Sequence, residues 1–413
     1  MKILMMVSRL FPASVGGAER QCLRQAQALA RRGHEVRIVT KWLDSSSARF
    51  EKMDGIQVWR RGCFFSVRKA LRRQVARTMP DATETDKAQP LNPSGDRLPF
   101  RSRWQSISER ARNSLFMAEV AWGVMTGRFK ADVIHVHESH WLAGFAQWVG
   151  EKMGIPVFCK EAFLPVLLFG GDRNVPWADE WKARRTQCRF IAMTDGIVNE
   201  LQAAGIPGER IIQIPNGVFL PATIADPTLH ADALYVGNFT QGAAHKGFDV
   251  LLKAWGLVHR QESGVKLRLY GRGDVKIWKT YADELGCGNS VVFEGETNDI
   301  WAAHGRSGFL VMPSRREGLS NALLEAMASG LPSVVSNIPG NIAAVRNGVE
   351  GVVVPAGDVE ALAGAILMMC RSSELRAQMG RAARTRVDEI FAIGKVAEKL
   401  EVAYGQVING GKS

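Results

Sequence analysis

The stretch Arg315-Arg316-Glu317-Gly318-Leu319-Ser320-Asn321-Ala322-Leu323-Leu324-Glu325-Ala326-Met327-Ala328-Ser329-Gly330-Leu331-Pro332 decides how the second half of the chain folds. It follows the apolar run Gly308 to Met312, which has the length and composition of a buried strand. Gly318 then turns the chain into a short helix, and Gly330 ends that helix. Apolar residues recur at helical spacing on one face, which leaves the other face free for chemistry. The stretch therefore predicts a strand, a loop and a helix, the repeating unit of an α/β domain.

Two carboxylates bracket the start of this helix. Glu317 precedes its first turn, and Glu325 lies about two turns further on. The backbone N–H groups between them have no partner inside the helix and lie at its positive end, which suits a phosphate. A carboxylate beside such a site can accept hydrogen bonds from sugar or ribose hydroxyls. The pattern indicates a sugar nucleotide, although an isolated pair of glutamates is more often a pair of solvated helix charges.

The segment from Glu317 to Pro332 resembles the E-x7-E signature of the retaining GT-B glycosyltransferases of family 4. A glycine after the first glutamate, alanines around the second and the final G-x-P make the match specific. The resemblance extends from Gly16-Gly17 to the helix after Pro355 and is weakest at residues 41 to 130. It implies an α/β fold of two Rossmann-like doubly wound domains that face a cleft, with a C-terminal helix crossing back to the first domain.

The expected domains follow from the same resemblance. The turn Ile214-Pro215-Asn216-Gly217-Val218 resembles the segment that ends the first domain in this family, and a polar stretch follows it as the linker. The boundaries are 1–217 for an N-terminal acceptor domain, 218–388 for a nucleotide-sugar donor domain, and 389–413 for the helix that returns to the first domain.

Composition fits two ordinary globular domains. The chain has 413 residues, of which 46% are hydrophobic and 23% charged. Its six cysteines form no C-x-x-C pair and no zinc spacing, which favours reduced thiols in a cytoplasmic protein. The apolar opening Met1 to Val7 is too short for a secretory signal, and no apolar run is long enough to span a membrane.

The formal net charge of +12 implies an anionic partner. Seven basic residues and no acid lie between residues 60 and 77, interleaved with Phe64, Phe65 and Val67. The segment is consistent with an anionic membrane surface, with a solvated helix face or with a nucleic-acid patch. No helix-turn-helix, zinc-finger or RNA-binding motif supports nucleic acid, so we expect no nucleic-acid partner.

The opening of the chain predicts a βαβ unit, with strand 3–7, helix 18–32 and strand 35–40. Gly16 and Gly17 lie at the carboxyl end of the first strand, where doubly wound sheets place ligands. They do not form the G-x-G-x-x-G dinucleotide fingerprint. The resemblance places the glycine pair near the donor phosphate and the acceptor, and a plain tight turn is nearly as good an interpretation.

Residues 78 to 103 are rich in proline and polar residues and show no periodicity, which predicts a mobile segment before a helix at 104–125. The strand Asp132 to Glu138 then places His135 and His137 on one face. No cysteine or aspartate nearby completes a metal-ligand set, so we expect no metal. By resemblance, His137 is a candidate on the acceptor side.

The strand Val157 to Phe163 departs from the family pattern. Many relatives have a histidine at its end, near the reacting sugar carbon, whereas this chain has Lys160-Glu161-Ala162. The departure leaves the catalytic base open. It makes Glu161 a candidate catalytic residue and Lys160 a candidate contact to acceptor or phosphate, with an ion pair at the strand end as the alternative.

The second half offers further donor-binding candidates. Lys246 opens a helix in the segment K-G-F-D-V-L-L, which resembles the family and would place a point charge on a diphosphate. Asn238 stands where relatives usually have an arginine, so Arg272 or another base has to supply a second charge. Glu296 follows a strand and can contact a nucleobase.

The resemblance implies transfer of a sugar from a nucleoside diphosphate sugar to an acceptor hydroxyl with retained configuration. In this interpretation Glu317 binds the sugar and Glu325 binds the ribose. The diphosphate is bound by Lys246 and by the backbone amides of Gly318, Leu319, Ser320 and Asn321. The chain contains no D-x-D, so no metal cofactor is expected. Expected acceptors are glycans or lipid-linked glycans of lipopolysaccharide, capsule or exopolysaccharide. Two alternatives remain open, namely a nucleotide-sugar epimerase or hydrolase of the same fold and a sugar-nucleotide binding protein without catalysis.

Overall fold

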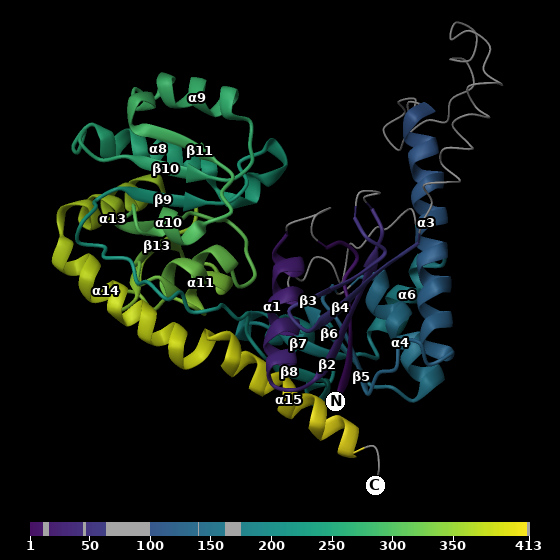
Figure 1. Ribbon diagram of the computed structural model, residues 1–413. Coiled ribbons are helices and arrows are strands. Elements are labelled where there is room, and N and C mark those ends of the chain that lie inside the picture. Colours follow the sequence, from purple (N-terminus) through teal and green to yellow (C-terminus); the bar gives the residue numbers. More distant parts are fainter. Residues whose placement is uncertain (11–15, 44–46, 63–99, 139, 162–174, 411–413) are drawn as a thin grey trace, which may run out of the picture. The chain divides into compact units, whose positions relative to one another are not determined.

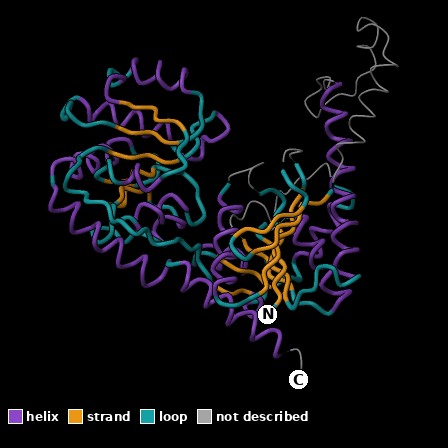
Figure 2. The backbone as a smooth tube through the Cα atoms, viewed as in Figure 1, coloured by secondary structure: helices purple, strands orange, loops and turns teal. Residues whose placement is uncertain are grey.

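The computed structural model describes residues 1–10, 16–43, 47–62, 100–138, 140–161 and 175–410 of the chain (Figure 1). By contact density it divides into two compact units, one formed by Met1–Ile191 with Ala403–Ser413 and the other by Ala192–Val402. Each contains a parallel α/β arrangement, with strands in the middle and helices on the outside (Figure 2).

The first sheet has eight strands in the order β3-β4-β2-β1-β5-β6-β7-β8. Its strands are β1 (Lys2–Met6), β2 (Glu35–Lys41), β3 (Phe50–Met53), β4 (Ile56–Arg61), β5 (Val133–Val136), β6 (Val157–Glu161), β7 (Arg189–Ala192) and β8 (Ile211–Gln213). The pairings of β1 with β2 and β5, and of β5 with β6, are parallel, whereas the edge strand β3 runs antiparallel to β4. The central strands β1 and β5 are almost entirely buried because helices cover both faces of a parallel sheet. β8 falls in the second unit.

The helices of the first unit pack on this sheet. They are α1 (Gly17–Arg31), α3 (Phe100–Met125), α4 (Trp141–Met153) and α6 (Ala178–Arg185). α3 packs on α4, and α4 packs on α6, β5 and β6, so these three helices form one layer beside the strands (Figure 1). Tyr404, near the end of α15 (Ile393–Gly410), contacts Phe158 of β6 with ring centroids 5.0 Å apart. The C-terminal helix thus returns to the first unit, as the resemblance implied.

The second sheet has six strands in the order β11-β10-β9-β12-β13-β14, and all its pairings are parallel. The strands are β9 (Ala233–Val236), β10 (Leu267–Tyr270), β11 (Val291–Gly295), β12 (Phe309–Met312), β13 (Ser333–Ser336) and β14 (Gly351–Val354). β9 has β10 as its neighbour on one side and β12 on the other, so the strand order runs outward from β9 in both directions. The carboxyl end of the strands at such a switch point is where sheets of this kind bind ligands.

The second unit contains most of the helices in the part of the chain that the structure describes. They are α7 (Asp195–Ala203), η2 (Gly208–Arg210), η3 (Gln241–Lys246), α8 (Phe248–His259), α9 (Val275–Glu284), η4 (Gly288–Ser290), α10 (Ile300–His304), α11 (Asn321–Ala328), α12 (Pro339–Ile342), α13 (Val359–Arg371), α14 (Ser373–Arg386) and η5 (Val387–Phe391). Its core packs α8 and α13 against the sheet. Trp255 is fully buried there and donates its indole N–H to the Ser290 hydroxyl at 2.9 Å, so this large side chain carries no unpaired polar atom.

Two expectations for the first half need correction. α3 begins at Phe100, so residues 100–103 are helical rather than part of a mobile segment, and residues 78–99 lie outside the described part of the chain. Arg60 and Arg61, at the start of the basic stretch, are buried. Arg60 lies 2.5 Å from Glu51, and Arg61 lies over the Trp59 ring at 4.7 Å, so both arginines stabilise the sheet edge instead of forming a basic surface. The rest of that stretch lies outside the described residues.

Candidate functional site

An ion pair joins two loops at the carboxyl ends of neighbouring strands in the second unit. Lys246, the last residue of η3, donates its ammonium to the carboxylate of Glu317, which follows β12. The Lys246 side chain is 26% exposed and that of Glu317 14%, so the pair is partly shielded from water. The sequence predicted both residues for a diphosphate sugar, and the structure brings these two together.

The first loop is fixed by its own backbone and by a second ion pair. Gly247 adopts a left-handed conformation with φ +68°, and a Cβ atom there would lie 2.0 Å from the Pro313 carbonyl oxygen, so only glycine fits. Arg315 donates one hydrogen bond to each carboxylate oxygen of Asp249, at 2.8 and 2.7 Å. Its backbone N–H also donates to the His245 carbonyl at 2.8 Å. These contacts hold the two loops in one arrangement and thereby keep Lys246 and Glu317 next to each other.

The second loop is held from the other side by a glycine and an asparagine. A Cβ atom at Gly340 would lie 1.6 Å from the Gly318 carbonyl oxygen, so α12 packs directly on the loop backbone. The side chain of Asn216 is buried and donates to the Leu319 carbonyl at 2.7 Å. Asn216 thereby fixes the turn that leads into α11.

The helix α11 begins where the sequence predicted a phosphate site. Ser320 is its N-cap residue, with extended backbone angles and no side-chain capping bond. Leu319 and Ser320 are largely buried, at 3% and 8% exposure. Glu325 lies in the middle of the helix with a fully buried side chain. Its predicted role at a ribose stays a prediction.

The remaining donor candidates, Asn238, Arg272 and Glu296, lie just after β9, β10 and β11. Arg272 and Glu296 form an exposed ion pair at 2.6 Å, and the hydrogen bond that Arg272 donates to this carboxylate raises the pKa of Arg272. Asn238 is exposed, and its carbonyl accepts a hydrogen bond from Tyr235 at 3.3 Å. Burial, and then the charge of Glu317, raises the pKa of Tyr235.

Gly16 and Gly17 belong to the first unit. Gly16 is the N-cap residue of α1, and Gly17 is its first residue. A Cβ atom at Gly16 would lie 2.3 Å from the Glu19 carboxylate, so a larger residue would displace that side chain. Their predicted contact with a donor phosphate stays a prediction.

The first unit also holds the acceptor-side candidates, and all of them are buried. His135 and His137 stack with centroids 4.2 Å apart, and His135 bonds the Tyr404 hydroxyl at 2.6 Å. Burial, and then the charges of His135 and Lys160, hold the pKa of His137 well below its usual value, so its ring is neutral. Neither its ring nitrogens nor the Lys160 ammonium has a hydrogen-bond partner among the described residues.

Lys160 and Glu161 do not form the alternative ion pair at the strand end. They are neighbours on β6, so their side chains point to opposite faces of the sheet. The carboxylate of Glu161 acts on Arg185, whereas Lys160 interacts with Cys22. Within the described residues, no three histidine, cysteine or acidic side chains are placed to hold a metal ion.

Replacing Lys160 with methionine is expected to flatten the pH dependence of stability above neutrality. Burial holds the pKa of Lys160 at about 7, against its ordinary 10.5. Between these values only the unfolded chain binds the proton, so the free energy of unfolding of the parent protein rises with pH, by at most about 1.4 kcal/mol per unit. That contribution is lost as the pH falls from 10.5 to 7. Urea unfolding at several pH values in this window measures both slopes; parallel curves for the two proteins would show that Lys160 keeps its proton on folding.

Sequence reasoning missed two residues that build the site. Asn216 was assigned only to a domain-ending turn, and Gly340 was not singled out. The signal for Asn216 was present, because an asparagine in a Pro-Asn-Gly turn after a strand commonly bonds nearby backbone. Gly340 gives no such signal, since its importance comes from α12 packing on a loop more than twenty residues earlier in the chain.

Two family models match the chain. Residues 16–217 match the model described as glycosyl transferase 4-like domain, and residues 230–372 match glycosyl transferases group 1. Together they take in every strand of both sheets except β1, and every candidate residue named above.

Curated relatives agree with these models. The chain is 30% identical to a phosphatidyl-myo-inositol mannosyltransferase of Mycobacterium leprae (strain TN), over 59% of this chain and 66% of that protein. It is 28% identical to the capsular polysaccharide biosynthesis glycosyltransferase CapM of Staphylococcus aureus, over 41% of this chain and 44% of that protein. The chain therefore spans less than two thirds of the length of either relative.

A solved structure shows the same fold. The Anabaena protein HepE, crystallised with UDP-glucose, superposes with a TM-score of 0.67 and 17% identity, over 98% of this chain and 100% of that one. None of the described helices combines the length and apolarity that a membrane crossing requires.

Proposed function

The chain belongs to the group 1, family 4 glycosyltransferases, and from this premise we propose that it transfers a sugar from a nucleoside diphosphate sugar to an acceptor hydroxyl with retention of configuration. The observation that carries the proposal is the meeting of Lys246 and Glu317 beside the start of α11. A cation for a diphosphate and a carboxylate for sugar hydroxyls are thereby side by side in one unit. The complex of HepE with UDP-glucose supports a nucleotide-sugar donor.

Each donor group has a distinct task in this proposal. Lys246 and the amides of Gly318 to Asn321 neutralise charge that builds on the departing diphosphate. Glu317 accepts hydrogen bonds from the transferred sugar, and Glu325 from the ribose. Arg272 supplies a second positive charge on the diphosphate side, and Glu296 contacts the nucleobase. No metal cofactor is included.

The reaction is a substitution at the anomeric carbon of the sugar. The bond from that carbon to the diphosphate oxygen breaks, and the acceptor oxygen forms a new bond to it from the same face. The acceptor proton passes to the departing phosphate oxygen, so the products are the glycoside and the nucleoside diphosphate. Stabilising the leaving group is then the main task of the protein.

The acceptor is proposed to be a glycan or lipid-linked glycan of a bacterial cell surface. The mannosyltransferase of phosphatidyl-myo-inositol and the capsular enzyme CapM are the relatives that support this class. His137, Lys160 and Glu161 are the acceptor-side candidates, with Glu161 as the candidate catalytic group. Acceptors of this kind make a peripheral position on the inner face of the cytoplasmic membrane part of the proposal.

A donor panel tests the function. The purified protein is incubated with UDP- and GDP-sugars, with and without bacterial glycolipid extract, and released nucleoside diphosphate is measured together with the mass of the product. We expect release that depends on the extract and a product heavier by one sugar residue. Release without any acceptor would instead identify an epimerase or hydrolase. Donor binding without release over long incubation would identify a binding protein.

The membrane part of the proposal has its own test. The triple variant Arg68→Glu, Arg72→Glu and Arg73→Glu reverses three charges of the basic stretch. We expect it to pellet several-fold less with phosphatidylglycerol vesicles than the parent protein does, because each basic residue near an anionic surface contributes about 1 kcal/mol. Equal pelleting of both proteins would remove this stretch from the proposal.

A further inference from the structure

Glu317 and a bound diphosphate would compete for the same ammonium group. Glu317 accepts a hydrogen bond from Lys246, the group assigned above to the diphosphate. The loops that carry the two residues are tied together by the Arg315–Asp249 pair and by the bond from the Arg315 N–H to His245. The ion pair is therefore built into the loop arrangement and is not a chance contact of two mobile side chains.

The surroundings make this competition costly for a bare diphosphate. Glu317 is 14% exposed, so water screens its charge poorly. The nearby positive groups are Lys246 and Arg316, whereas the pKa of His245 is lowered by burial and then by the charge of Lys246, so its ring adds no positive charge at neutral pH. A diphosphate that takes Lys246 leaves a carboxylate beside a second anion, and like charges at such a distance repel.

A sugar on the diphosphate changes this balance. Its hydroxyl groups are donors and can replace the ammonium as hydrogen-bond partners of Glu317. We propose that Glu317 is a specificity-determining residue that makes the site favour the sugar-loaded donor over the released nucleoside diphosphate, by competing with the latter for Lys246. This inference rests on the proposed function and deepens it, because it assigns the same site a means of expelling its product.

The test measures binding of UDP and GDP by calorimetry to the parent protein and to Glu317→Gln. The substitution keeps the shape and removes the charge. For whichever of the two nucleotides the parent protein binds, we expect the Kd of the variant to be roughly threefold to tenfold lower. This is the range for loss of a partly shielded ion pair. Affinity for the matching nucleotide sugar is expected to change less, so the preference for the loaded donor shrinks.

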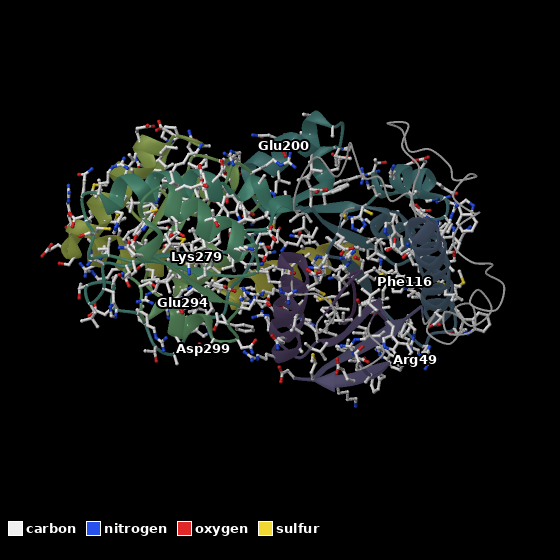
Figure 3. All side chains as sticks on the ribbon, turned by 90° about the horizontal axis from the view of Figure 1, so that it is seen from above. Arg49, Phe116, Glu200, Lys279, Glu294 and Asp299 are labelled. Atoms are coloured by element: carbon white, nitrogen blue, oxygen red, sulfur yellow. The ribbon has the colours of Figure 1, made fainter. Side chains whose placement is uncertain are left out.

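Glu200→Gln is the matched control. Glu200 lies on α7 and is labelled in Figure 3. Its carboxylate interacts electrostatically with Arg316, the neighbour of Glu317 in the sequence. The substitution Glu200→Gln removes the same charge near the same loop and leaves the Lys246–Glu317 contact intact. Its nucleotide affinity is therefore expected to stay within about twofold of the parent value. The double variant Lys246→Met/Glu317→Gln completes a cycle in which Glu317→Gln is expected to gain much less than in the parent protein, because only the repulsion between carboxylate and diphosphate remains to be relieved.

The outcomes separate this inference from the function on which it rests. Nucleotide binding that Glu317→Gln leaves unchanged or weakens overturns the inference alone. A gain that is equally large without Lys246, or that Glu200→Gln reproduces, also overturns it, since the effect would then be general electrostatics. Tighter binding to Glu317→Gln by a protein that transfers no sugar in the donor panel keeps the inference and overturns the transferase. Failure of the parent protein to bind either nucleotide overturns both.

Discussion

The variant Lys246→Met is expected to lower kcat for sugar transfer by about a hundredfold to a thousandfold, the range observed when one preorganised donor to a developing negative charge is removed. Lys246 bonds Glu317, and Gly247, which follows it in a left-handed conformation, fixes the backbone at this position. The charge it stabilises is larger in the transition state than in the bound donor, which is why kcat falls more than KM rises. Single-turnover kinetics with the active donor measure the two effects.

A second lysine of the same unit supplies the control for this prediction. Lys279, labelled in Figure 3 on α9, is exposed, and Lys279→Met removes the same charge from the same unit. Its kcat is expected to equal that of the parent protein. The variant Lys246→Arg keeps the charge but changes its geometry, so it should recover only part of the rate. A kcat for Lys246→Met within threefold of the parent value would remove Lys246 from the diphosphate.

Local sequence signals predicted the parts of the fold that depend on neighbouring residues. The apolar strands and the helix at 321–328 follow from periodicity, and the α/β order implies parallel sheets. The pairing of Lys246 with Glu317 was accessible because both residues end a strand-loop unit of the same sheet, where carboxyl ends meet. The resemblance to a family then gave these residues a chemical meaning.

Packing between distant segments could not be read from the chain in the same way. Arg60 and Arg61 belong to a run of basic residues, yet they are buried, because Glu51 on the edge strand β3 pairs with Arg60 and the Trp59 ring of their own strand packs on Arg61. Charge runs are usually solvated, and only the register of β3 with β4 explains the exception. Similarly, the buried His135, which stacks on His137, bonds the hydroxyl of Tyr404, more than two hundred residues later in the sequence.

The contact between α12 and the Glu317 loop leads to the second large effect. Gly340 lies in α12, and a Cβ atom there would be 1.6 Å from the Gly318 carbonyl oxygen and 2.6 Å from that of Glu317. Both obstacles are backbone atoms, which cannot rotate away as a side chain can. Alanine has the better helix propensity, by about 1 kcal/mol, but the collision outweighs it because overpacking a rigid contact typically costs 1–3 kcal/mol.

Gly340→Ala is therefore expected to lower the free energy of unfolding by about 2 kcal/mol and to lower kcat/KM at least tenfold, since the loop that carries Glu317 has to move. Denaturant unfolding and donor-saturation kinetics measure the two effects. The same substitution at Gly364, an exposed site on α13 with no atom within 4 Å of the added carbon, is expected to stabilise the protein by up to about 1 kcal/mol and to leave the kinetics unchanged. If both alanine variants behaved alike, the close approach of α12 would not be what positions Glu317.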